Sequence, residues 1–193
     1  MRSLHLEKKG LRGLVIAESF KENSKKSIFS GVVMRRDFLI DGFVFGSSTL
    51  EGDDATDVIL KMFYDLKRSD ISYVLISGLI VSMYNVINIK KLADTLQLPI
   101  IGISFNDSHG LEDAIKHHFP NSYESKIIAY RNLGKREKIL LDNSHLLYVR
   151  KEGCTLNEVK HLLNNLTLYG SIPEPIRVSK LLAKTLLQKG LSF

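Results

Sequence analysis

The stretch "SIFSGVVMRRDFLIDGFVFGSS", residues 27–48, carries the pattern that decides the fold. Its two halves are rich in β-branched and aromatic residues, and Arg35, Arg36 and Asp37 form a polar break between them. This pattern predicts two strands joined as a hairpin. The preceding stretch "LRGLVIAESF", residues 11–20, has the same composition, so the N-terminal part of the chain is predicted to form three strands.

Beyond these strands the pattern alternates between helix and strand. Residues 52–68 change to a helical period, and Asp53 or Asp54 is expected to be the N-cap of that helix. A buried strand is predicted around residues 73–76. Asn88 is expected to cap a short helix that follows it and runs through Leu96.

The second half of the chain continues the alternation and ends in helices. The stretch 98–105 reads as a strand, and 108–119 reads as a helix that ends before Pro120. Between Pro120 and Ser144 the sequence is polar and of mixed charge, which indicates a loop-rich segment. The remaining predicted elements are a strand at 145–153, a helix from 155 with a capping box of Thr155 and Glu158, and a final helix that starts after Pro173 or Pro175 and closes at Gly190.

This order of elements predicts an α/β fold, with a mixed sheet flanked by helices, in a single domain spanning residues 1–193. The chain has 193 residues and 44% hydrophobic residues, enough for one sizeable core. No segment has the roughly 18 uninterrupted apolar residues of a membrane helix, and "MRSLHLEKKG" lacks the apolar core of a signal peptide. A cytoplasmic protein without a membrane partner is therefore predicted.

Charge and the reactive residue types narrow the function classes. With 27 Lys and Arg against 21 Asp and Glu, the net charge of +6 fits a polyanionic partner such as DNA or RNA, but it is equally typical of a solvated basic surface. The single cysteine, Cys154, excludes an intrachain disulfide and a multi-cysteine zinc site. His117 and His118 are adjacent, so on a helix they point about 100° apart and do not form a metal-binding pair. The sequence does not predict the oligomeric state.

Acidic residues at the ends of predicted elements are the candidate chemistry. Glu18 lies at the end of the first strand, and Asp53 and Asp54 lie where a loop enters a helix. A magnesium-dependent hydrolase needs several such carboxylates, because the ion is coordinated by oxygen and must hold a water and a phosphate together. The structural alternative makes Asp54 a helix cap and Glu18 a solvated charge, and spacing alone favours it.

Four motifs, in order along nearly the whole chain, resemble a known family. The stretch "IPEPIR" (172–177) is similar to the Pro-Glu-Pro-x-Arg pattern that opens the last helix of endonuclease V. Together with "GVVMR" (31–35), "EGDDAT" (51–56) and "ISGLIVSMYN" (76–85), it resembles more closely an uncharacterised archaeal family related to endonuclease V. The resemblance implies an RNase H-like fold with a metal site formed by acids at strand ends.

The sequence departs from the family pattern at those acids. The relatives end their first strand in a Gly-x-Asp or Gly-x-Asp-Asp pattern, where this chain has Ala17 at the first acid and Glu18 at the second. Ser77 stands at the position of a metal-binding aspartate of endonuclease V, and Lys180 stands at the position of a histidine. Asp54 aligns with the catalytic glutamate. The resemblance therefore implies that Glu18 and Asp54 are remnants of a site that has lost its acids at Ala17 and Ser77.

A site with so few carboxylates holds Mg²⁺ or Mn²⁺ weakly or not at all, because a hydroxyl is a poor ligand for a hard cation. We expect an endonuclease V-like protein that binds nucleic acid or another phosphate-bearing ligand, with little or no nuclease activity. Any metal would bind at Asp54 and Glu18, and Lys180 and Arg177 are the candidate phosphate-binding residues. Arg177 also fits a structural role, in an ion pair that ties the last helix to the sheet. Endonuclease V's Pro-Tyr-Ile-Pro wedge is absent, so recognition of deaminated bases is not expected from the resemblance.

Two other functions are compatible with the sequence. Glu18 and Asp54, with a neighbour such as Asp53, would form the site of an active Mg²⁺- or Mn²⁺-dependent endonuclease or phosphodiesterase. Neighbouring strand residues point to opposite faces, so Glu18 replaces an acid at Ala17 only if the strand bulges. The other alternative is a non-enzymatic protein-interaction module, since a fold does not fix a function.

Overall fold

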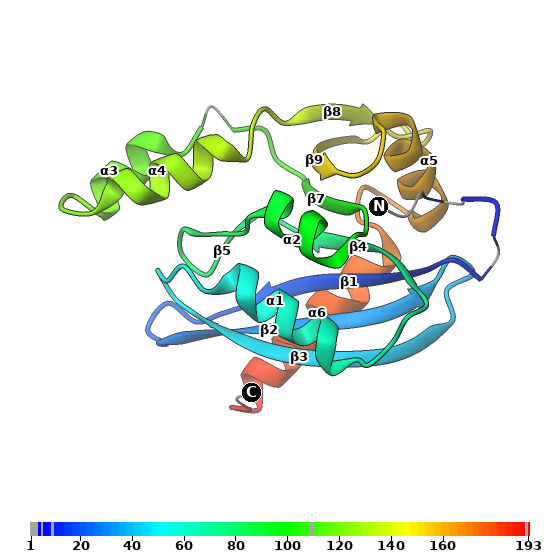
Figure 1. The fold of residues 1–193 in the computed structure, drawn as a ribbon, viewed down its shortest axis with the longest axis horizontal. Coiled ribbons are helices and arrows are strands. Elements are labelled where there is room, and N and C mark those ends of the chain that lie inside the picture. Colours follow the sequence, from blue (N-terminus) through cyan, green and yellow to red (C-terminus); the bar gives the residue numbers. More distant parts are fainter. Residues whose placement is uncertain (1–3, 5, 9, 109, 192) are drawn as a thin grey trace.

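The computed structural model describes residues 4, 6–8, 10–108, 110–191 and 193, and its centre is a seven-stranded mixed sheet in the order β3-β2-β1-β4-β7-β9-β8 (Figure 1). The strands of this sheet are β1 (Arg12–Ser19), β2 (Lys26–Arg35), β3 (Ile40–Thr49), β4 (Ile71–Ser77), β7 (Ile100–Ser104), β8 (Glu137–Leu140) and β9 (Leu146–Glu152). A separate two-stranded ladder pairs β5 (Ile80–Val81) with β6 (Asn85–Val86).

Strand directions bring three carboxyl ends to one edge of the sheet. The strands β1, β2 and β3 form an antiparallel meander, whereas β4 runs parallel to β1 and β7 runs parallel to β4. At the far side, β9 is antiparallel to β7 and β8 is antiparallel to β9. The ends of β1, β4 and β7 therefore lie together, where α/β proteins commonly place their sites.

Helices cover both faces of the sheet. The helices are α1 (Ala55–Asp65), α2 (Ile89–Leu96), α3 (Glu112–His118), α4 (Tyr123–Asn132), α5 (Leu156–Leu166) and α6 (Glu174–Gln188). In β1, Leu14 and Ile16 pack with residues of α1 and α2, and Val15 packs with residues of α5 and α6. We call these two faces the α1 face and the α6 face. Figure 1 shows α3 and α4 packed on each other at one end of the molecule, near β5.

Most predicted elements are present, including the hairpin of β2 and β3. Asn88 caps α2 by accepting a hydrogen bond of 2.9 Å from the Lys91 N–H, and Thr155 and Glu158 form the predicted capping box of α5. The final helix begins at the prolines and is followed by Gly190, whose φ of +70° is typical of a helix C-terminus. Among the described residues, no helix is long and apolar enough to cross a membrane.

The prediction of a loop-rich segment between Pro120 and Ser144 is wrong, because α4 and β8 lie there. The helix α4 buries only Lys126 and Ile127, so its inner face includes a charged residue and gives no apolar period. The edge strand β8 buries only Ile139. The helix α4 packs on α3, and β8 pairs with β9, so both elements depend on tertiary contacts that local patterns do not predict.

Candidate functional site

Ala17 and Ser77 lie side by side at the carboxyl ends of β1 and β4. Ile16 pairs with Ile76 in the parallel register, so Ala17 and Ser77 are the next pair along the two strands. Both Ile16 and Ile76 pack on the α1 face. By strand alternation, Ala17 and Ser77 belong to the α6 face. Ala17 is 2% exposed.

The helix α6 covers the position of Ala17 on this face of the sheet. Ala17 pairs with Ser30 of β2, and the Ser30 hydroxyl lies 2.8 Å from the Ser179 hydroxyl of α6. The Ser179 hydroxyl also donates to the Ser30 carbonyl, at 2.8 Å. The space beside the Ala17 methyl group is therefore bounded by buried, hydrogen-bonded serines that carry no charge.

Glu18, the next residue of β1, turns to the α1 face. Its Oε1 accepts a hydrogen bond from the Ser82 N–H and its Oε2 accepts one from the Ser82 hydroxyl, both at 2.8 Å. The Ser82 hydroxyl also lies 2.6 Å from the Ser27 hydroxyl. Burial raises the pKa of Glu18, although the bonds from Ser82 and the charge of Lys180 act in the opposite direction.

Ser82 is positioned by an unusual turn between β5 and β6. Ser82, Met83 and Tyr84 have φ values of 45°, 58° and 69°, so three successive non-glycine residues are left-handed. Such a conformation costs about 1–2 kcal/mol per residue and persists only where the surroundings enforce it. Here the Ser82 carbonyl accepts from the Glu51 N–H at 2.7 Å while its N–H and hydroxyl bind Glu18.

Asp54 lies at the N-cap position of α1, yet its side chain does not cap the helix. Its carboxylate accepts hydrogen bonds from the Ser48 hydroxyl (2.6 Å), the Asn85 amide (2.8 Å) and the Thr49 hydroxyl (2.8 Å) and N–H. The Ala55 N–H at the start of α1 donates instead to the Asn85 side-chain oxygen. Partial burial raises the pKa of Asp54, but the bonds from Ser48, Thr49 and Asn85 outweigh it, so the pKa is lowered.

Asp53 does not approach Glu18, because it pairs with Lys126 of α4. The Lys126 side chain is 6% exposed, and its ammonium donates to the Asp53 carboxylate and the Gly52 carbonyl, both at 3.0 Å. His118 of α3 binds Glu51 of the same loop at 2.7 Å. These contacts fasten α3 and α4 to the loop before α1.

Lys180 and Arg177 lie on α6. Lys180 is exposed and near enough to Glu18 for its charge to lower the pKa of that carboxyl. Arg177 makes its ion pair inside the helix, with Glu174 at 3.2 Å, and also donates to the Tyr169 carbonyl at 3.4 Å. The expectation that Arg177 forms an ion pair with the sheet is therefore wrong, because its ion pair lies within α6.

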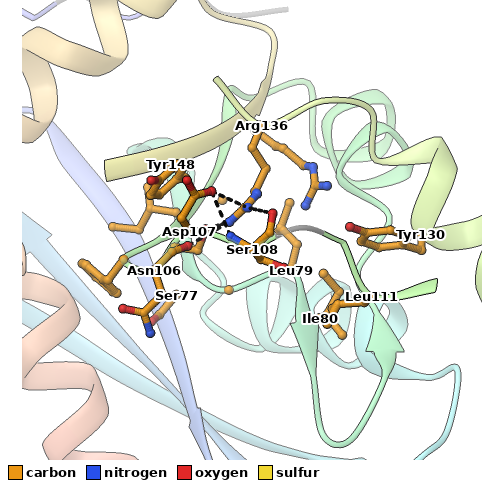
Figure 2. Close-up of a pocket in the computed structure, with 16 residues that line it drawn as sticks. Ser77, Leu79, Ile80, Asn106, Asp107, Ser108, Leu111, Tyr130, Arg136 and Tyr148 are labelled. Carbon is orange, nitrogen blue, oxygen red and sulfur yellow. Dashed lines mark hydrogen bonds and ion pairs between the residues drawn. The ribbon is translucent and has the colours of Figure 1, made fainter. Parts of the chain in front are cut away.

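A cavity of about 320 Å³ opens where β4 and β7 end, beneath α4. Figure 2 shows Tyr130 on one side of it and Arg136, Asp107 and Tyr148 on the other. The Arg136 guanidinium lies 4.7 Å from the centre of the Tyr148 ring and donates to the Ser108 carbonyl at 2.8 Å. The sequence did not indicate this cavity, because Arg136 lies directly before β8, which was not predicted, and Arg150 lies on β9.

Comparisons with known proteins identify the family. The sequence profile described as endonuclease dU matches residues 9–187. The chain belongs to the endonuclease dU family. A UPF0215 protein of Pyrobaculum calidifontis is 32% identical to this family member over 171 residues, which are 88% of this chain and 93% of the relative. This confirms the archaeal family that the motifs indicated.

Solved structures show the fold of this endonuclease dU family member. A protein of unknown function from Archaeoglobus fulgidus matches with a TM-score of 0.76 and 23% identity, over 91% of this chain and 98% of that one. Ciona intestinalis endonuclease V, in complex with a 24mer DNA containing an inosine followed by a ribo-adenosine, matches with a TM-score of 0.61 and 15% identity, over 95% and 88%. The RNase H-like, endonuclease V-like fold is therefore confirmed.

The strand-end residues of this endonuclease dU family member do not fit a divalent metal ion. Mg²⁺ requires several oxygen ligands in near-octahedral geometry. Ala17 and Ser77 offer a methyl group and a hydroxyl on the α6 face, while the oxygens of Glu18 and Asp54 accept hydrogen bonds on the α1 side. Within the part of the chain that the structure describes, no three His, Cys, Asp or Glu side chains are grouped to hold a metal.

Proposed function

We propose that this member of the endonuclease dU family binds nucleic acid and has little or no metal-dependent nuclease activity. The observation that carries the proposal is the separation of the strand-end residues between two faces. Ala17 and Ser77 share the α6 face without a carboxylate, and Glu18 is turned away from them toward Ser82.

Metal-assisted hydrolysis needs a cation that polarises the phosphate and lowers the pKa of an attacking water. To bind such a cation, Glu18 and Asp54 would have to give up their present donors. Those donors include Ser48, Ser82 and Asn85, all fully buried, and a buried donor left without an acceptor costs about 1–3 kcal/mol. The hydrogen-bonded network therefore competes directly with metal binding.

Nucleic-acid binding has separate support. The net charge is +6, and the cavity at the carboxyl ends of β4 and β7 is lined by Arg136 and Arg150. Guanidinium groups bind phosphate through paired, charge-assisted hydrogen bonds. The endonuclease V of Ciona intestinalis, which shares the fold, is in complex with DNA in its structure. Phosphate contact by Lys180 and Arg177 on α6 is part of the same proposal.

The test is a paired measurement of binding and cleavage. Single- and double-stranded DNA and RNA, with and without deoxyuridine or inosine, are incubated with the protein in Mg²⁺ or Mn²⁺. We expect binding whose logarithm falls linearly with the logarithm of salt concentration, and no cleavage above background. Metal-dependent cleavage that is lost in both Glu18→Gln and Asp54→Asn would overturn the proposal and establish an active phosphodiesterase. Absence of binding at low salt would overturn the nucleic-acid part.

A further inference from the structure

The cavity beneath α4 contains an arginine whose charge is not neutralised. Arg150 of β9 pairs with Gly102 of β7, and its side chain lines the cavity. Its Nε donates to the Gly134 carbonyl at 2.9 Å, and its guanidinium lies 5.6 Å from the centre of the Tyr130 ring. Among the described residues, no carboxylate forms an ion pair with it. The guanidinium also bonds the Tyr130 side chain, and an anionic ligand would supply the counter-charge that the described residues do not.

Arg136, in the same cavity, already uses its guanidinium group for contacts within the protein. It donates to the Asn106 carbonyl at 2.9 Å and to the Ser108 carbonyl at 2.8 Å, and it pairs with Asp107 at 3.3 Å. Its side chain is 17% exposed. Arg136 therefore organises the loop after β7, and Arg150 is left as the group that can bind an anion.

A partly buried guanidinium without a carboxylate is costly to the fold. Burial lowers the pKa of Arg150, which shows that the surroundings disfavour its charge. An anionic ligand would offset this cost. The planar fork of an arginine side chain matches the oxygens of a phosphate group better than an ammonium group does.

The surface next to the cavity is also lined by basic and aromatic side chains. A shallower depression shares Arg136, Arg150 and both tyrosines with the cavity, and it adds Lys135 and Lys138 of the α4–β8 segment. We call the cavity and this depression the α4–β8 groove. The Lys138 ammonium lies 5.6 Å from the centre of the Tyr148 ring. A groove that alternates cations with aromatic rings is typical of proteins that bind single strands.

We propose that the α4–β8 groove binds a single-stranded nucleic acid, with a backbone phosphate on Arg150 and neighbouring phosphates near Lys135 and Lys138. This inference rests on the proposed function, because it assigns the nucleic-acid interface to a particular surface. Tyr130 of α4 is partly exposed and offers its ring to a base, whereas Tyr148 is 6% exposed and packs against Arg136. In a duplex the base faces are covered by their neighbours, so the groove discriminates in favour of single strands.

The competing structural role of Arg150 is to hold the α4–β8 connection through the Gly134 carbonyl. On that role, replacing Arg150 would lower stability without a specific effect on binding. The test therefore compares Arg150→Gln with Arg35→Gln. Arg35 lies at the opposite end of the sheet, where it pairs with Asp37, so its replacement removes the same charge without touching the groove.

Binding is measured by fluorescence anisotropy of a labelled oligothymidylate, alone and annealed to oligodeoxyadenylate, at constant salt. We expect the single strand to bind the wild-type protein more tightly than the duplex does. Arg150→Gln should weaken single-strand binding by about tenfold to hundredfold, and Arg35→Gln by no more than about twofold. Arg150→Lys retains the charge but loses the fork, so we expect an intermediate loss. If Arg150→Gln does not fold, Arg150→Lys is the variant that tests the proposal.

The outcomes separate the two proposals. If the wild-type protein binds neither probe at low salt, the proposed function fails. If it binds but Arg150→Gln and Arg35→Gln lose the same affinity, the groove assignment fails and nucleic-acid binding stands. Inorganic phosphate that displaces the strand as well as thymidine 5′-monophosphate does would assign the site to free anions and overturn the inference. Stronger competition by the mononucleotide supports it.

Discussion

Replacing Asp54 with alanine is expected to destabilise the protein by about 2–4 kcal/mol, because two of its donors are fully buried. The Ser48 hydroxyl and the Asn85 amide both donate to Asp54, and both side chains are 0% exposed. Leaving each donor without its acceptor costs about 1–3 kcal/mol. Asn85 keeps a bond of 3.2 Å to the Thr49 carbonyl, which limits the loss.

The sign of this effect distinguishes a structural acid from a metal ligand. A carboxylate kept for a cation sits in a site that is strained without it, so its removal in EDTA should leave stability unchanged or increased. A carboxylate that satisfies buried donors should be destabilising to remove whether or not metal is present. For a chain of this size, about 2–4 kcal/mol corresponds to a fall in Tm of roughly 5–15 °C.

The assay is urea and thermal unfolding followed by circular dichroism, in EDTA and in Mg²⁺. Asp57→Ala is the matched control, because Asp57 lies in the first turn of the same helix and pairs with exposed Lys91. We expect this control to cost less than about 1 kcal/mol. An Asp54→Ala variant as stable as the wild type in EDTA would refute the structural account of this acid.

The same experiment has a predicted pH dependence. The folded-state pKa of Asp54 lies below its ordinary value of 3.8, so the ionised carboxylate favours the folded state. Its contribution is complete above the unfolded pKa and is lost as the pH falls through the lowered folded pKa. The stability gap between the wild type and Asp54→Ala should therefore narrow below about pH 4.

Three further outcomes follow from the site. Burial raises the pKa of Glu18 above 4.5, so its ionised form costs stability above the raised pKa. Glu18→Gln should therefore stabilise the protein at neutral pH by a margin that shrinks as the pH falls through that pKa; urea unfolding across pH measures it, and a constant margin would contradict it. Ala17→Asp with Ser77→Asp buries new charge and should lower the Tm by several degrees in EDTA, and Mg²⁺ should raise the Tm of this double variant alone; an equal shift in the wild type would speak against a degenerate site. Burial raises the pKa of Cys154 to about 12, so the folded protein should react with iodoacetamide far more slowly than the urea-unfolded chain, and equal rates would show an accessible thiolate.

The sequence predicted those elements in which the local pattern of apolar residues matches the pattern of buried side chains. In β2, all residues between the first and the last are buried, so its apolar run was a reliable signal. The capping residues Asn88 and Thr155 were predictable for the same local reason, since each side chain bonds a backbone N–H three residues later. The helix α4 was missed because its inner face carries Lys126, which is buried by contacts with the distant loop at Gly52 and Asp53.

The site was predictable only in part. The motifs indicated that Ala17, Glu18 and Ser77 lie at strand ends, and the structure places them there. The motifs did not show that Ser82 and Asn85 satisfy the two acids. A left-handed turn is usually indicated in the sequence by glycine or asparagine. The turn that positions these two side chains instead has Ser, Met and Tyr at its left-handed positions. Its conformation is imposed by the partners rather than by its own residues.

The acids and the α4–β8 groove are connected through that turn. Glu18 holds Ser82 at one end of the turn, and the Tyr84 carbonyl at the other end accepts from the Lys126 ammonium at 3.4 Å. Lys126 belongs to α4, the helix that supplies Tyr130 to the groove. On the proposed function, Glu18 therefore acts on the groove through this turn, without touching the ligand. Glu18 positions Ser82, and Asp54 accepts from Asn85 directly after the turn, so each carboxylate has a role that does not depend on a metal ion.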